Sequence, residues 1–122
     1  MDDHDVVRRY LHAMQRGADG EDELVELFAE DGEYVESFSG SATVHRGRPA
    51  IRAWLRASWP HQPPEIRLIV EHSIVEQDVV RSTWRCESSA FATPSRGVDT
   101  YTIRAGLIAR LETVVTEPPV LL

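Results

Sequence analysis

Residues Arg96–Ile108, with the sequence RGVDTYTIRAGLI, predict two strands joined by a tight turn at Ala105–Gly106, and this hairpin is the clearest indication of the fold. Successive side chains of a strand point to opposite faces of its sheet, so Asp99, Tyr101 and Ile103 share one face. Because the other two residues of this face are a tyrosine and an isoleucine, we expect it to pack in the core and to carry Asp99 with it.

A carboxyl group on an apolar strand face has useful chemistry. Burial disfavours the charged form of a carboxylate, so we expect the pKa of Asp99 to be raised. A carboxylic acid that stays protonated near neutral pH can donate a hydrogen bond inside a dry pocket. The alternative is an aspartate that caps a neighbouring backbone group or pairs with an arginine, and the sequence leaves both interpretations open.

Length, composition and charge describe a single domain of ordinary type. The chain has 122 residues, of which 42% are hydrophobic and 27% charged, so we expect one core and one domain over residues 1–122. The formal net charge of −7 argues against binding to nucleic acid or to an anionic membrane surface. The single cysteine, Cys86, excludes an intrachain disulfide and favours the reducing cytoplasm, and no apolar run approaches the length of a membrane span.

Hydrophobic spacing predicts helices first and long strands afterwards. Helices are expected at residues 3–16 and 21–29 and from Pro49 up to the prolines that begin at Pro60, with a short strand at residues 33–38. The period then changes from 3.6 to 2, which predicts strands at residues 66–76, 79–92, 97–104 and 107–116. We therefore expect an α+β fold in which three N-terminal helices pack on one face of a curved antiparallel sheet and leave a conical cavity between them.

Short segments spread along this order carry a family resemblance. They are Val7–Tyr10, Leu27–Gly32, His45–Gly47, Ile51–Arg52, Val80–Trp84 and Asp99–Tyr101. Together they resemble the nuclear transport factor two-like superfamily, in its SnoaL-like and ketosteroid-isomerase-like branch, over roughly residues 4–116. The resemblance implies a cystatin-like roll, and a function among isomerases, polyketide cyclases, dehydratases, epoxide hydrolases, transport factors and non-catalytic binding domains.

The same resemblance implies roles for particular polar residues. In the isomerases a tyrosine of the first helix and an aspartate of the penultimate strand donate hydrogen bonds to an enolate oxygen, and Tyr10 and Asp99 occupy these positions. In the cyclases the same aspartate position is similar to an acid/base group that acts on an enolisable polyketide. The isomerase base, an aspartate on the first short strand, corresponds here to Ser37, which is no base unless it is itself activated.

Other residues are candidates for the missing base. Glu36 enters the pocket if it shares the inward face of the short strand with Tyr34, and it is solvated if Ser37 faces inward, which is the phase that the family alignment favours. His45 precedes the third helix, and histidine is the natural general base near pH 7, with a surface-loop histidine as the alternative. For Tyr10 the alternative is a core tyrosine whose hydroxyl binds a backbone group.

Aromatic residues predict an apolar pocket for a flat or polycyclic ligand, since three tryptophans occur in this small domain. Trp54 and Trp84 are the first candidates to line it, and plain core packing is the alternative. No Gly-rich phosphate loop and no zinc-ligand spacing occur in the sequence, so we expect neither a nucleotide cofactor nor a metal ion. The expected ligand-binding residues are Met14, Phe28, Ser37, Phe38, Trp54, Leu55, Trp59, Trp84, Cys86 and Tyr101.

These observations favour a cofactor-independent enzyme that moves protons on a small apolar carbonyl compound, by isomerisation, cyclisation or dehydration. Asp99 is the expected acid or acid/base and Tyr10 the oxyanion donor, with Glu36, His45 or water held by the substrate as the second base. The alternatives are a ligand-binding domain of the same fold without turnover, and a partner-binding module that uses the sheet face. We also expect a homodimer, formed through the outer face of the sheet.

Overall fold

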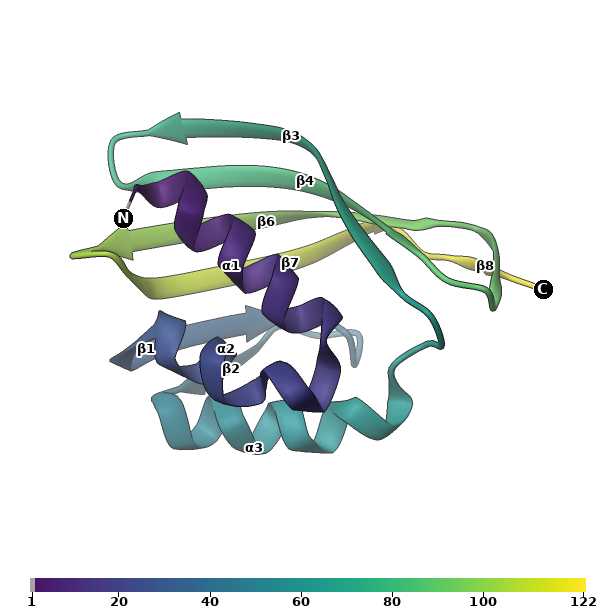
Figure 1. Ribbon diagram of the computed structural model, residues 1–122, viewed down its shortest axis with the longest axis horizontal. Coiled ribbons are helices and arrows are strands. Elements are labelled where there is room, and N and C mark those ends of the chain that lie inside the picture. Colours follow the sequence, from purple (N-terminus) through teal and green to yellow (C-terminus); the bar gives the residue numbers. More distant parts are fainter. Residues whose placement is uncertain (1) are drawn as a thin grey trace.

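The computed structural model describes residues 2–122 as a curved sheet with helices on one face (Figure 1). The elements are α1 (Asp3–Gln15), the 3₁₀ helix η1 (Gly17–Gly20), α2 (Glu21–Leu27), β1 (Phe28–Glu36), β2 (Thr43–Arg46), α3 (Arg48–Ser58), the 3₁₀ helix η2 (Trp59–His61), β3 (Arg67–Glu76), β4 (Val79–Glu87), β5 (Phe91–Thr93), β6 (Ser95–Arg104), β7 (Leu107–Glu117) and β8 (Val120–Leu121). The expected α+β fold, with three helices before the long strands, is confirmed.

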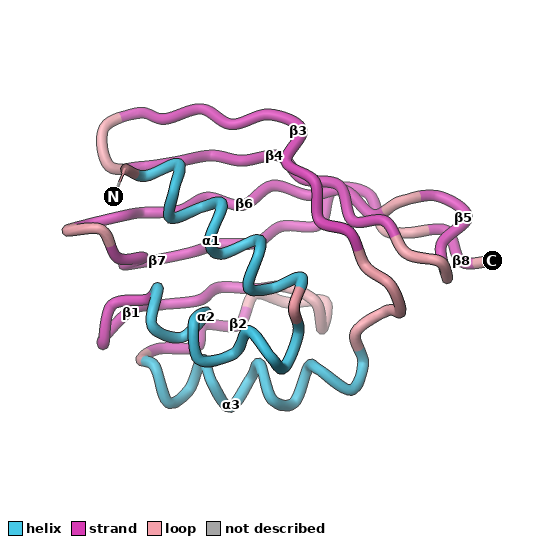
Figure 2. The backbone as a smooth tube through the Cα atoms, viewed as in Figure 1, coloured by secondary structure: helices cyan, strands magenta, loops and turns pink. Residues whose placement is uncertain are grey.

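The main sheet has six strands in the order β2-β1-β7-β6-β4-β3, and β5 pairs with β8 in a separate ribbon. Figure 2 shows this ribbon at the end of the molecule where the chain ends. All neighbours in the main sheet are antiparallel except β1 and β7, which run parallel. The sheet is therefore mixed, and the expectation of a wholly antiparallel sheet is wrong for this pair. No hairpin joins β1 to β7, so turn geometry does not fix their relative direction.

The long hairpin predicted over Arg96–Ile108 is confirmed. Asp99, Tyr101 and Ile103 are 4%, 0% and 3% exposed, so their face of β6 does lie in the core. Ala105 and Gly106 both have positive φ angles, of 52° and 76°, which is the backbone of a two-residue turn between twisted antiparallel strands.

Edge-to-face aromatic contacts tie α1 to the sheet. The ring of Tyr10 lies 5.7 Å from that of Tyr101 and 6.3 Å from that of Phe28, measured between centroids. Leu24 of α2 and Ile51 of α3 are fully buried in the same core. Figure 1 shows α1 crossing the face of the sheet that these side chains occupy.

Several element boundaries differ from the expected ones. The second helix ends at Leu27, because Phe28 already pairs with Ile108 of β7. The strand expected at residues 79–92 ends at Glu87, and the chain then turns so that Phe91 pairs with Leu121 in the ribbon. Strand β2 is a four-residue edge strand with alternating exposure, and the sequence analysis did not predict it. Within residues 2–122 no helix is long and apolar enough to cross a membrane.

Candidate active site

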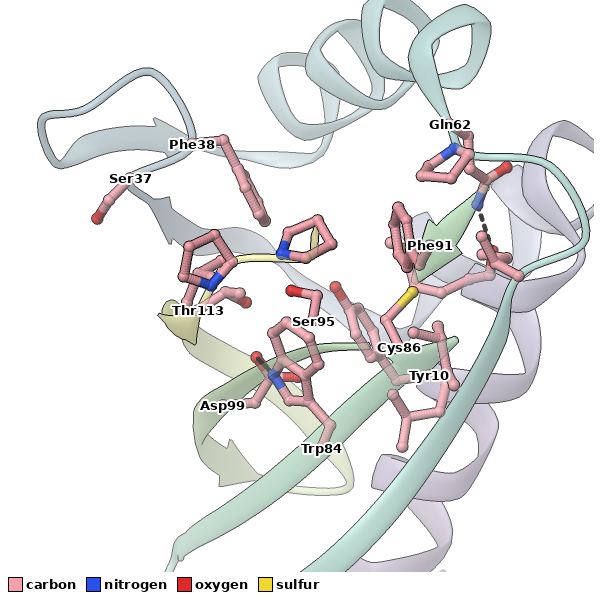
Figure 3. A pocket seen from close by; sticks show the side chains of 18 of the residues that line it. Tyr10, Ser37, Phe38, Gln62, Trp84, Cys86, Phe91, Ser95, Asp99 and Thr113 are labelled. Atoms are coloured by element: carbon pink, nitrogen blue, oxygen red, sulfur yellow. Dashed lines mark hydrogen bonds between the residues drawn. The ribbon is translucent and has the colours of Figure 1, made fainter. Parts of the chain in front are cut away.

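A cavity of about 520 Å³ lies between α1, the concave face of the sheet and the segment after α3 (Figure 3). Strands β4, β6 and β7 supply one wall, and α1 supplies the opposite wall with Tyr10, Leu11 and Met14. Most of the lining side chains are apolar. Among the described residues that line this cavity, Asp99 is the only one with a carboxyl group, and none carries a positive charge.

Strand pairing places three hydrogen-bond donors around Asp99. The indole Nε1 of Trp84 on β4 donates to Oδ1 at 3.1 Å, and the hydroxyl of Tyr101, two residues along β6, donates to Oδ2 at 3.1 Å. Thr113, which faces Asp99 across the β6–β7 ladder, contributes a third side-chain hydrogen bond. Figure 3 shows Asp99, Trp84 and Thr113 grouped on one wall. No ion pair with an arginine forms at Asp99 in the described part of the chain, so the arginine-paired alternative does not apply.

Burial raises the pKa of Asp99 to about 6, although the hydrogen bonds from Thr113, Tyr101 and Trp84 stabilise the charged form and limit the rise. The pKa of Asp99 is thus raised, as the sequence predicts. The carboxyl is nevertheless mainly ionised at pH 7, so a protonated donor is not its main form there. An ionised carboxylate with a pKa this close to neutrality is suited to accept a proton.

Tyr10 reaches the same cavity from α1. Its side chain is 4% exposed, and burial raises the pKa of its phenol well above the usual value, so the group stays protonated. Its hydroxyl donates a hydrogen bond to Tyr34, which interacts in turn with Thr113 and so with Asp99. A continuous set of hydrogen-bonded side chains therefore links the predicted donor to the predicted acid/base group.

Sequence reasoning missed Tyr34 and Thr113. The predicted turn gave no signal for Thr113, because an unshifted hairpin at Ala105–Gly106 would place Glu112 opposite Asp99. A register shift between Thr102 and Ile103 brings Thr113 there instead. Tyr34 was missed because the phase of β1 was misjudged. Tyr34 and Glu36 are 3% and 4% exposed and face the helices, so the favoured phase, with Glu36 solvated, is wrong.

The physical reason for this error lies in the aromatic packing of β1. Tyr34 contacts Phe28 and Trp54, with ring centroids 6.4 Å and 4.9 Å apart, and this side chain fills the space beneath α3. Val35, on the opposite face, is also buried, so the strand has no purely polar side that would reveal its phase. Ser37 is exposed at the rim of the cavity, and its hydroxyl points away from Asp99 in Figure 3.

Glu36 and His45 lie together, but beside a different cavity. His45 Nε2 and Glu36 Oε2 are 2.8 Å apart, and Oε1 accepts the backbone N–H of Phe38 at 3.0 Å. The β1–β2 register opposes His45 to Tyr34, and its ring lies 5.6 Å from that of Trp54. Glu36 lines a second cavity of about 650 Å³, beneath α3, whereas Asp99 lines the first.

The expected ligand-binding residues divide between the two cavities. Met14, Ser37, Phe38, Trp84 and Cys86 line the first, and Trp54, Leu55 and Trp59 line the second, together with Met14 and Phe38. Phe28 and Tyr101 line neither cavity, because both are fully buried core residues. The first cavity also includes Gln62, Pro63, Pro118 and Pro119, which no periodic pattern marks.

Within residues 2–122, no three His, Cys, Asp or Glu side chains are placed so that they could hold a metal ion.

A curved sheet with helices on one face and an apolar cavity between them is the arrangement expected for a SnoaL-like domain, and a family model supports this class. The model of the SnoaL-like domain matches residues 7–111. The chain therefore belongs to the SnoaL-like domain family. No curated protein shows significant sequence similarity to it.

Solved structures with the same fold carry several functional names. A candidate polyketide cyclase from Sinorhizobium meliloti is 25% identical, with a TM-score of 0.72 over 90% of this chain and 94% of that one. A candidate ketosteroid isomerase from Kribbella flavida is 17% identical, with a TM-score of 0.69 over 93% of this chain and 76% of that one. TerC, co-crystallised with polyporic acid, is 17% identical, with a TM-score of 0.74 over 91% and 88%. Other similar structures are of unknown function.

Proposed function

We propose that this protein is an enzyme that transfers protons on a small apolar carbonyl compound without a cofactor, as in isomerisation, cyclisation or dehydration. One observation carries the proposal: the buried carboxyl of Asp99, with a pKa of about 6, faces an apolar cavity of about 520 Å³. A general base is most effective when its pKa lies near the working pH, and an apolar cavity of this size accommodates a small organic molecule. Its family and the names of similar structures support a function of this class.

In the proposed mechanism, Asp99 removes a proton from the carbon next to the carbonyl group. The electron pair of the broken C–H bond moves into the enolate, and the negative charge develops on the carbonyl oxygen. Tyr10 turns its hydroxyl from Tyr34 to this oxygen and stabilises the charge by a hydrogen bond. Asp99 then returns the proton to another carbon, or to a leaving oxygen, so that one carboxyl serves first as base and then as acid.

Trp84, Tyr101 and Thr113 act as positioning residues in this mechanism. Their hydrogen bonds hold both oxygens of Asp99 in place and moderate its pKa. Glu36 and His45 stay predictions as a second acid/base pair, for a ligand that extends into the second cavity. The homodimer and the cytoplasmic location likewise stay predictions.

A ligand-binding domain without turnover is the second candidate function. It is favoured by the fact that both oxygens of Asp99 already accept hydrogen bonds from the protein. A carboxylate held by the protein in this way also fits a purely structural role.

Deuterium exchange separates the two functions without knowledge of the natural substrate. A panel of mono- and polycyclic ketones is incubated with the protein in D₂O, and NMR measures the loss of the proton next to the carbonyl group. We expect exchange with at least one ketone, slowed about 100-fold or more in Asp99→Asn. We expect Tyr10→Phe to slow it by at least about tenfold.

The matched control is Asp19→Asn, which makes the same chemical change on an exposed side chain of η1. It should exchange like the wild type, and Asp99→Asn should still bind the ketone with unchanged affinity. Ketones that bind without any exchange would establish the binding domain instead. Equal exchange rates in the wild type and Asp99→Asn would remove Asp99 from the mechanism.

A further inference from the structure

The second cavity is lined by aromatic side chains and a carboxylate. It lies beneath α3, with Trp54, Leu55 and Trp59 on one side and the end of β1, with Glu36 and Phe38, on the other. It adjoins the first cavity at Met14, Phe38 and Gln62, which line both. The function proposed for Asp99 makes no use of its walls.

Glu36 gives this cavity a negative charge. Its side chain is 4% exposed, and its two oxygens accept one hydrogen bond each, from His45 Nε2 and from the backbone N–H of Phe38. These two hydrogen bonds orient the carboxylate of Glu36. No arginine lines this cavity among the described residues, and the other titratable group on its wall is His61.

Aromatic rings make up much of the remaining wall. Phe38 and Trp54 stack with centroids 6.0 Å apart and an interplanar angle of 21°, and Trp59 lines the same cavity. Phe38 is 55% exposed, so its ring is accessible to a ligand in this cavity. Aromatic faces attract cations, and the attraction grows when the cation is removed from water.

A carboxylate and aromatic rings in one cavity select for one kind of ligand. An anion is repelled by Glu36, and a neutral apolar ligand adds no positive charge to the hydrogen bonds that the carboxylate already accepts from His45 and Phe38. A bare metal ion requires several oxygen or nitrogen ligands, and the described residues offer no such group here. An alkylated ammonium group satisfies both features, because its charge meets the carboxylate while its methyl groups contact the rings.

We propose that the second cavity is a binding site for a small organic cation, an alkylammonium or quaternary ammonium group held by Glu36 against Phe38, Trp54 and Trp59. The negative net charge of the chain, −7, draws cations toward the protein and favours the same ligand. The site does not depend on Asp99 or on the reaction proposed for the first cavity.

The test uses tetramethylammonium chloride as the probe, in a titration followed by NMR of the indole N–H groups of Trp54 and Trp59. We expect a saturable shift of at least one of these signals in the wild type. Tert-butanol, a neutral molecule of similar size, and sodium chloride at the same concentration should not reproduce it. A response to tert-butanol of equal affinity, or no saturable response to the cation, would overturn the proposal.

Two variants identify the groups responsible. Glu36→Gln keeps the size and shape of the side chain but removes its charge. We expect it to weaken cation binding by about tenfold or more. Phe38→Leu removes an exposed ring while keeping the charge, and it should weaken binding by a smaller factor. Asp19→Asn is the control and should bind like the wild type.

Cation affinity unchanged in Glu36→Gln would contradict the assignment. Should that variant fail to fold, Phe38→Leu and the comparison with tert-butanol still decide the question. Ketone exchange in the wild type and in Asp99→Asn is measured separately, so failure of the cation site and failure of the proposed reaction are distinguishable.

Discussion

Two opposing effects set the pKa of Asp99. Removal from water raises its pKa, and the hydrogen bonds from Thr113, Tyr101 and Trp84 lower it, with burial the larger effect. The charged form of Asp99 is thus less stable in the folded protein than in the unfolded chain. The rise from 3.8 to about 6 corresponds to about 3 kcal/mol of folding free energy lost on ionisation.

This cost predicts how Asp99→Asn changes the pH dependence of stability. Because the folded-state pKa is raised, the stability that Asp99 contributes is fully present below pH 3.8 and is lost as the pH rises through about 6. The variant has no such loss. Between pH 3.5 and 7.5 its free energy of unfolding, relative to the wild type, should rise by about 3 kcal/mol, measured by urea denaturation. The other carboxyl groups titrate in both proteins and cancel, so a difference that stays constant with pH would contradict a desolvated Asp99.

At the level of the secondary-structure elements, the pairing of β6 with β4 leaves space for the indole of Trp84 beside Asp99. Gly97 of β6 pairs with Trp84 of β4, and a Cβ atom at Gly97 would lie 2.2 Å from the Trp84 ring and 2.6 Å from the carbonyl oxygen of Val114. Because glycine has no side chain, the indole of Trp84 can pack against the backbone at Gly97, and its N–H reaches Asp99.

Gly97→Ala should destabilise the protein by about 1–3 kcal/mol, because the ring and the backbone of β7 must both move. It should also break the hydrogen bond from Trp84 and raise the pKa of Asp99 further, since a donor that lowers this pKa is lost. Thr100→Ala, on the opposite face of the same strand, serves as control in thermal unfolding and in NMR titration. A stable variant with an unshifted Trp84 indole signal would show that the close packing at Gly97 is unimportant.

Strands β6 and β1 differ in how well the sequence predicts which of their side chains are buried. The alternation in β6 and the small residues of its turn are unambiguous, and both the hairpin and the burial of Asp99 follow from them. In β1 the two faces are both partly apolar, so the phase depends on the space under α3, which only the packed structure defines. The lining residues after α3 and in the tail are also set by tertiary packing, and no local pattern marks them.

At the scale of the whole molecule, the C-terminal tail closes one side of the first cavity. Pro118 and Pro119 line it, and β8 pairs with β5 just beyond them. Val120 and Leu121 are 55% and 66% exposed, and the tail contributes nothing to the main hydrophobic core. We therefore expect its removal to have little effect on the main sheet and core.

Deletion of residues 118–122 should leave the protein folded and open the first cavity to water. The indole N–H of Trp84, whose side chain faces this cavity, should then exchange faster with D₂O. The indole of Trp59 donates to Glu21 away from this cavity and should exchange as before. An unchanged exchange rate at Trp84 would show that the tail does not restrict access.

The proposed role of Asp99 as a base depends on its side-chain pKa, which carbon NMR measures in a pH titration of the unliganded protein. We predict a midpoint near 6, as expected for a desolvated carboxyl that can accept a proton at neutral pH. A midpoint at or below the ordinary value of 3.8 would mean that water or a positive charge reaches the group. The proposed proton transfer would then lose its base.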